Sequence, residues 1–122
     1  MTDREKLQVI VSALDSKKAL DIKIIRVEKL TSLAEYFVLA SGGSTTQVKA
    51  LSDEVEFKMK ENGEMPQGVE GYTGSASWVL LDYNSIVVHV FGTETREFYS
   101  LERLWQDGEE LNVEEFLGGE EK

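Results

Sequence analysis

The sequence predicts an α/β fold in which a mixed β-sheet is flanked by helices. Two segments carry apolar residues at helical spacing, and several short runs of β-branched and aromatic residues lie around them. The clearest strand pair is 78–83 followed by 86–91, with only Asn84 and Ser85 between the two runs. Because asparagine tolerates the positive φ of a tight two-residue turn, these runs predict an antiparallel hairpin.

The N-terminal half predicts a helix followed by two strands. Thr2 and Glu5 have the spacing of a capping box at the start of the helix. Residues 21–27 alternate in polarity and predict the first strand. Residues 35–40 are almost continuously apolar, which is typical of a strand buried on both faces. The apolar residues at helical spacing in the first helix are Leu7, Ile10, Val11 and Leu14.

A glycine turn at residues 41–44 ends the second strand and opens a second helix. Ser44 and Gln47 predict its N-terminal cap, and Asn62-Gly63 predicts its end. Strand–glycine–helix junctions also form phosphate-binding loops. However, Gly42-Gly43-Ser44 matches neither GxxxxGK[ST] nor GxGxxG. We therefore interpret the junction as a turn and helix cap, with nucleotide binding as the less favoured alternative.

The C-terminal part predicts one more helix and an acidic tail. Ser100 has the residue type of a helix cap, and the apolar residues after it fall on one face. From Asp107 onward the chain is mostly acidic, with one helical turn expected after Asn112. These features predict one domain over residues 1–107 and an acidic, mobile tail over residues 108–122.

Composition excludes several classes of protein and favours one kind of partner. The 122 residues include 23 acidic and 13 basic residues, for a net charge of −10, and no cysteine. Disulfides and zinc–thiolate sites are therefore excluded, and no apolar run reaches the roughly 20 residues of a membrane span. We expect a cytoplasmic protein that avoids membranes and free nucleic acid. A basic protein would instead be attracted.

The residues give no support for an enzyme, a metal site or a cofactor. His89 is the only histidine, and no GxSxG motif supplies a nucleophilic serine. We expect His89 to be structural, and Asp82 on the neighbouring strand is a candidate partner that would hold its imidazole. The carboxylates at Asp53, Glu54 and Glu56 lie on a predicted helix rather than in the strand pair that two-metal chemistry needs.

Several residues near the hairpin are instead of the types found at protein–protein interfaces. Trp78, Arg96 and Tyr99 belong to the aromatic and guanidinium classes that contribute most to binding. Asp82 would pair with a lysine or arginine of a basic partner. Phe57 lies off the apolar stripe of the second helix, so a homodimer through Phe57 or the sheet edge is a separate hypothesis.

Five stretches of the chain together resemble one known family, that of the ribosomal silencing factors, also called the Iojap family. They are SLAEYFVLASG, QVKALSDEVE, GVEG, WVLLDYNSIVVHVF and ETREFYSLERLW, and the resemblance covers about residues 7–105. Two positions depart from the family pattern. Asn84 stands where the family usually has glycine, and Thr46 stands where an arginine or similar residue is usual.

The resemblance implies a nucleotidyltransferase-like topology without enzymatic activity. It also implies binding to the large ribosomal subunit through ribosomal protein uL14, on the face where the small subunit docks. Occupying that face would block subunit joining and repress translation under nutrient limitation. Alternatives are a cryptic nucleotidyltransferase-like enzyme and an assembly factor for the large subunit. The residues that the resemblance and the residue types assign to partner binding are Glu70, Trp78, Asp82, Arg96 and Tyr99.

Overall fold

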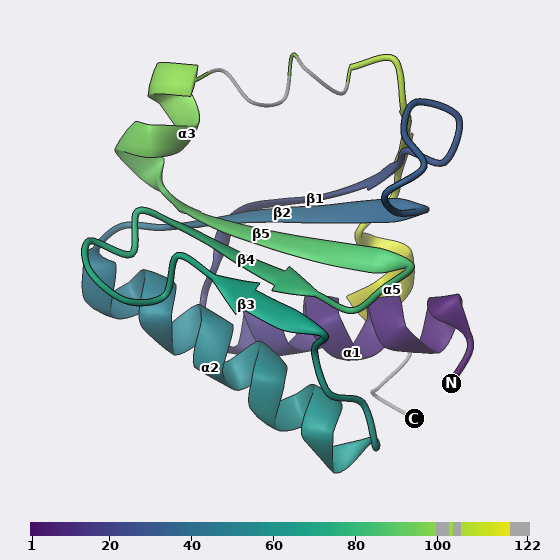
Figure 1. Ribbon diagram of the computed structural model, residues 1–122, viewed down its shortest axis with the longest axis horizontal. Helices are drawn as coiled ribbons and strands as arrows, with labels where there is room; N and C mark the ends of the chain where they lie inside the picture. The colour runs from purple at the N-terminus through teal and green to yellow at the C-terminus, as the bar shows by residue number, and fades with distance from the viewer. Residues whose placement is uncertain (100–102, 104–105, 118–122) are drawn as a thin grey trace.

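The computed structural model describes residues 1–99, 103 and 106–117, with residues 97–99 described as backbone only. Its elements in chain order are α1 (Asp3–Ser16), β1 (Leu20–Arg26), β2 (Tyr36–Gly42), α2 (Thr45–Glu61), β3 (Gly68–Glu70), β4 (Trp78–Asp82), β5 (Ile86–Gly92), α3 (Thr93–Tyr99), β6 (Glu109–Leu111) and α5 (Glu114–Leu117). Figure 1 shows α1, α2 and α5 on one face of the sheet and α3 on the other.

The six strands form one mixed sheet in the order β3-β4-β5-β2-β1-β6. The central pair, β2 and β5, is parallel, and the other neighbouring strands are antiparallel. The predicted mixed sheet flanked by helices is therefore confirmed. Among the described helices the longest is α2 with 17 residues, and none of them is long and apolar enough to cross a membrane.

The predicted start of the first helix is confirmed atom by atom. The backbone N–H of Glu5 donates to Thr2 Oγ1 at 3.1 Å, and the backbone N–H of Thr2 donates to Glu5 Oε1 at 2.9 Å. This reciprocal pair satisfies two N–H groups that the first helical turn would otherwise leave unpaired. α1 thereby begins at Asp3 and packs its apolar face, Leu7 to Leu14, against the sheet and α2.

The ends of α2 differ in detail from the predicted caps. The N–H of Gln47 donates to Ser44 Oγ at 3.1 Å, as predicted, but the amide oxygen of Gln47 accepts from Gly43 at 2.7 Å. At the other end only Gly63 is left-handed, with a φ of +84°, whereas Asn62 has a φ of −100°. Glycine takes that conformation at little cost because it has no Cβ to clash with the preceding turn.

The predicted hairpin of β4 and β5 is confirmed. The two strands pair from Trp78↔Phe91 to Asp82↔Val87, and Asn84 in the turn has a φ of +76°. One carboxylate oxygen of Asp82 accepts the backbone N–H of Asn84 at 2.8 Å. Such a bond from an aspartate to the backbone two residues later stabilises a turn.

The C-terminal segment corrects the expectation of an acidic tail from residue 108. β6 pairs antiparallel with β1, and Arg26 Nη1 lies 3.4 Å from a carboxylate oxygen of Glu109. Phe116 of α5 is buried in the main core. Residues 109–117 are therefore part of the domain. β1 would otherwise be an edge strand with unpaired backbone groups, and burying the Phe116 ring removes apolar surface from water. Residues 118–122 lie outside the described residues.

A helix that was not predicted follows the hairpin. α3 starts at Thr93, directly after β5, and ends at Tyr99, before the predicted cap at Ser100. The predicted cap and the apolar face at 101–105 lie largely outside the described residues. Because α3 follows β5 directly, Arg96 lies against the sheet, where it donates a hydrogen bond to Ser41 of β2.

Two hydrophobic clusters lie on opposite faces of the sheet. The larger cluster joins the sheet to α1, α2 and α5. The smaller cluster lies on the other face, where α3 contacts β2 and β5. Its buried residues are Ile25, Val27, Ala34, Phe37, Leu39, Val87 and Phe91. The alternation of side chains along β2 and β5 supplies both clusters from the same strands.

Two glycines in the β3–β4 loop allow a matched test of this fold. Gly71 and Gly74 have φ values of +82° and +78°, but a Cβ on Gly71 would lie 2.1 Å from the backbone oxygen of Trp78, whereas one on Gly74 would meet nothing within 4 Å. We expect Gly74→Ala to lower the free energy of unfolding by about 1 kcal/mol. Gly71→Ala should cost about 1–3 kcal/mol more, because backbone must move. Urea denaturation of both variants checks this, and equal losses would contradict the close approach.

Candidate partner-binding site

A hollow of about 360 Å³ lies on the α3 face of the sheet; we call it the sheet hollow. Its floor is formed by alternate residues of β2, β4 and β5, which point to the same face because side chains alternate along a strand. Its lining residues are Leu33, Phe37, Leu39, Glu70, Trp78, Leu80, Asp82, Val87, His89 and Phe91. Three of the five predicted binding residues, Glu70, Trp78 and Asp82, are therefore brought together.

The sheet hollow has an apolar centre with carboxylates at its border. Leu33 is 78% exposed and Trp78 38% exposed, so both offer apolar surface to a partner. Glu70 is exposed and Asp82 half-buried. Exposed apolar groups beside acidic groups form a surface that suits a partner with apolar and basic side chains. Leu33 was not predicted, because a lone leucine in a loop carries no sequence signal.

Trp78 and His89 are joined by a hydrogen bond across the hairpin. The indole N–H of Trp78 donates to His89 Nδ1 at 3.2 Å. The ring of His89 lies 4.6 Å from that of Phe37 and 5.9 Å from that of Phe91, measured between centroids. This bond corrects the expectation that Asp82 holds the imidazole. Asp82 faces Val87 in the strand register and accepts from the turn instead.

Burial fixes the protonation state of His89. Its side chain is almost fully buried, and this desolvation lowers its pKa to about 4. The imidazole is therefore neutral at pH 7. Because Nδ1 accepts the indole N–H, the ring proton is on Nε2. A neutral, buried ring of this kind can accept a hydrogen bond and pack against its neighbours, and the structural role expected of His89 stays a prediction.

Arg96 is not a surface residue, which corrects its assignment to partner binding. It is only 5% exposed, and its Nη1 donates to Ser41 Oγ at 2.8 Å. Because α3 begins at Thr93, Arg96 falls in the first turns of a helix that contacts β2 and β5. A charged hydrogen bond here connects α3 to β2. For Tyr99 only the backbone, at the end of α3, is described, so its binding role stays a prediction.

The glycine turn lies in a separate, polar hollow of about 260 Å³ at the carboxyl ends of β2 and β5. It is lined by hydroxyl groups and glycines, together with the carboxylate of Glu94. Ser44 caps α2, and the hydroxyl of Thr45 donates to the backbone oxygen of Ser75 at 3.2 Å. Within the described ranges no group of three or more candidate ligands could hold a metal ion. Capping explains this junction.

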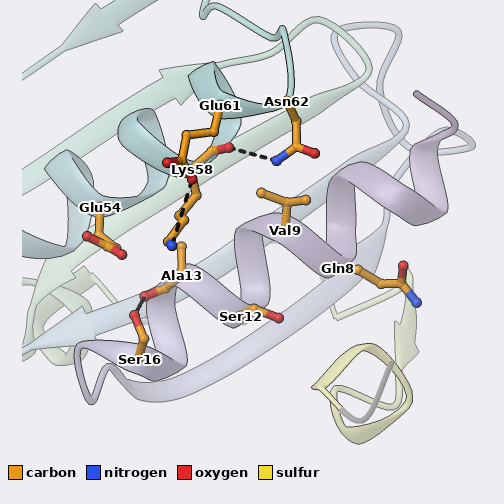
Figure 2. Close-up of a pocket in the computed structure, with 9 residues that line it drawn as sticks. All are labelled: Gln8, Val9, Ser12, Ala13, Ser16, Glu54, Lys58, Glu61 and Asn62. Atoms are coloured by element: carbon orange, nitrogen blue, oxygen red, sulfur yellow. Dashed lines mark hydrogen bonds and ion pairs between the residues drawn. The ribbon is translucent and has the colours of Figure 1, made fainter. Parts of the chain in front are cut away.

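A third hollow, of about 510 Å³, lies between α1 and α2 on the opposite face of the sheet. Figure 2 shows Lys58 extending from α2 toward α1, with its amine joined to Glu61. Neither Trp78 nor any other predicted binding residue lines this groove. Among the described residues, its lining includes neither an aromatic residue nor an arginine.

The fold is a sandwich of helices and a mixed sheet, with one apolar sheet face bordered by carboxylates. A model of the family described as "Ribosomal silencing factor during starvation" matches residues 1–122. The chain belongs to this family of ribosomal silencing factors, which are regulatory proteins rather than enzymes.

Individual relatives agree with this membership. The chain is 36% identical over 114 residues to "Ribosomal silencing factor RsfS" of Halalkalibacterium halodurans, covering 93% of this chain and 97% of that protein. A crystal structure of a protein from Chromobacterium violaceum, 40% identical, superposes with a TM-score of 0.83 and covers 87% of this chain and 88% of that one. "Mitochondrial assembly of ribosomal large subunit protein 1" of Mus musculus is 32% identical over 81% of this chain and 44% of that protein.

The lowered pKa of His89 predicts a pH-dependent stability. Between pH 6.5 and about 4 the unfolded chain binds a proton on this residue and the folded chain does not. The free energy of unfolding should therefore fall as the pH drops through this window, by up to about 3 kcal/mol from this group. Urea denaturation at several pH values measures it. His89→Leu should remove this component, and an unchanged pH profile in that variant would contradict the assignment.

The burial of Arg96 predicts an effect on stability. Arg96→Ala should lower the free energy of unfolding by about 2 kcal/mol, because the buried hydrogen bond to Ser41 is lost. Exposed Arg103 is the matched control, and Arg103→Ala should change stability by less than about 0.5 kcal/mol. Urea denaturation midpoints of the two variants and the wild type measure these losses of stability. If the Arg96→Ala protein were as stable as the wild type, the buried structural role of Arg96 would be contradicted and its predicted role in partner binding would be favoured again.

Proposed function

We propose that this protein is a ribosomal silencing factor that binds the large ribosomal subunit through ribosomal protein uL14. By occupying the surface where the small subunit docks, it blocks subunit joining and represses translation under nutrient limitation. The observation that carries this proposal is family membership over residues 1–122, whose description names silencing during starvation. The proposed site of action is the cytoplasm, where ribosomal subunits join.

The sheet hollow supplies a physical basis for such binding. Its apolar centre can bury partner side chains, and Glu70 and Asp82 complement the basic residues that ribosomal proteins carry. The net charge of −10 speeds encounter with a basic protein and opposes direct contact with ribosomal RNA. Blocking by occupation needs only a stable complex, so the mechanism requires neither a catalytic group nor a cofactor.

A role in assembly of the large subunit is a second candidate, favoured by the name of the mouse relative. Binding to the same protein of the large subunit would serve either role. The two roles differ in when the protein binds. An assembly factor would sediment with immature particles, and its loss would cause precursors to accumulate. A silencing factor would sediment with mature large subunits, and adding it would reduce subunit joining in a purified system.

An enzyme built on the glycine turn is the remaining alternative, because a polar hollow lies beside Gly42 and Gly43. A nucleotide with Mg²⁺ would then raise the melting temperature, since a ligand that binds only the folded state stabilises it. We expect no such shift. A saturable shift would favour a nucleotidyltransferase-like activity over the proposal.

The proposal predicts binding to large but not small ribosomal subunits. Trp78→Ala and Tyr99→Ala should weaken it at least about tenfold, or about 1.4 kcal/mol, because rigid aromatic residues contribute much of the energy at interface centres. Phe57→Ala is the control: Phe57 is 54% exposed, but lies on α2 across the sheet. Co-sedimentation and melting curves are measured for each variant.

Equal pelleting of the wild-type protein with both subunits would contradict the proposed function. Wild-type affinity in folded Trp78→Ala and Tyr99→Ala proteins would move the binding surface away from the sheet hollow. A loss confined to Phe57→Ala would place that surface on α2, the element proposed for a homodimer contact.

A further inference from the structure

We infer that His89 is a positioning residue for binding: its Nδ1 atom holds the Trp78 indole in the orientation that a docked protein partner recognises. The inference rests on the proposed function, because it deepens the role of Trp78 in the sheet hollow. It also specifies what Trp78 offers to the partner, namely its ring rather than its N–H group. Each step follows from contacts within the hairpin of β4 and β5.

The position of Trp78 would leave its side chain free to change rotamer unless another residue held it. It is the first residue of β4, directly after the loop that contains Gly74, and its side chain is 38% exposed. An exposed aromatic side chain without such contacts samples several rotamers, and binding must then restrict it to one. A side chain that is already fixed in the free protein loses less conformational entropy when the partner docks.

His89 provides the acceptor, and the geometry allows one assignment. An indole N–H can only donate, so His89 Nδ1 must accept the 3.2 Å hydrogen bond. The indole also packs on the ring of Phe91, with centroids 5.2 Å apart. Trp78 faces Phe91 in the strand register, so His89 is its diagonal neighbour on the same face. Two contacts of different kinds thus fix one ring.

His89 is itself well suited to hold another side chain. It lies on β5, with Leu80 of β4 and Leu39 of β2 as its register partners on either side. Its exposed fraction is 7%, and the ring of Phe37 lies 4.6 Å away. A group packed from several sides has little freedom to move. The neutral ring keeps its Nδ1 lone pair at physiological pH, since burial lowers its pKa.

The bond also decides the chemistry that the partner meets. Because the N–H of Trp78 is directed to His89, the remaining exposed part of the indole is apolar ring surface. This surface lies beside Glu70 and Asp82 in the same hollow. A second copy of this acidic chain, or a phosphate backbone, would be repelled there. A protein segment that buries apolar groups against the ring is favoured.

The test compares two substitutions of His89 in two backgrounds. His89→Asn keeps an acceptor near the position of Nδ1, whereas His89→Leu fills the space without one. Each is made in the wild-type chain and in a Trp78→Phe chain, which keeps an aromatic ring but has no N–H. Affinity for purified large ribosomal subunits, melting temperature and the indole N–H resonance of Trp78 are measured. Trp78→Phe identifies that resonance among the two tryptophans.

We expect His89→Leu to weaken binding about tenfold and to shift the indole resonance in the free protein. His89→Asn should stay within about threefold of the wild-type affinity. In the Trp78→Phe background, replacing His89 by leucine should have no further effect on affinity, because the bond is already absent.

Three results would overturn the inference. Wild-type affinity in a folded His89→Leu protein would do so while leaving the proposed function intact. An equal loss in the His89→Asn and His89→Leu proteins that persists in the Trp78→Phe background would show a purely structural role. Absence of wild-type binding to large subunits would overturn the proposed function, and the inference with it.

Discussion

The parallel pairing of β2 with β5 is the constraint on which the rest of this structure depends. The two strands pair over seven residues each, from Tyr36↔Ile86 to Gly42↔Gly92, at the centre of the sheet. The outer strands then add antiparallel on each side, β1 and β6 next to β2, and β4 and β3 next to β5. Because both central strands end at the same edge, α2 and α3 begin there and diverge to opposite faces (Figure 1).

Successive side chains of the central strands point to opposite faces of the sheet, and the two faces have different roles. On β5, Val88 and Val90 point into the main core, whereas Val87, His89 and Phe91 line the sheet hollow. Packing of α1, α2 and α5 on the first face supplies most of the buried apolar surface. The second face can therefore keep exposed apolar groups such as Leu33 without loss of the fold. This separation of a core face from an open face is compatible with the proposed function, in which the protein occupies a partner's surface.

Two side-chain hydrogen bonds connect elements on the second face of the sheet. Arg96 reaches Ser41, and Trp78 reaches His89, in each case between residues of different elements. The first bond connects α3 to β2 and the second connects β4 to β5, so each ties a neighbouring element to one of the two central strands. The acidic border of the hollow adds charge complementarity for a basic partner.

Short sequence patterns, each a few residues long, were enough to predict several local features of the structure. The cap at Thr2, the turn at Asn84 and the buried run of β2 all follow from local chemistry. The gathering of Trp78, Asp82 and His89 on one hairpin could also be predicted, although the bond between Trp78 and His89 could not.

Only the tertiary structure decided the strand order, the burial of Arg96 and the place of residues 109–117. β3 and β6 have three residues each, too few to show a period in the sequence, and form because longer strands offer them partners. In the sequence, the acidic residues of β6 suggest a solvated tail. In the structure, they pair with the open edge of β1. These features depend on contacts between residues far apart in the chain, which local patterns do not encode.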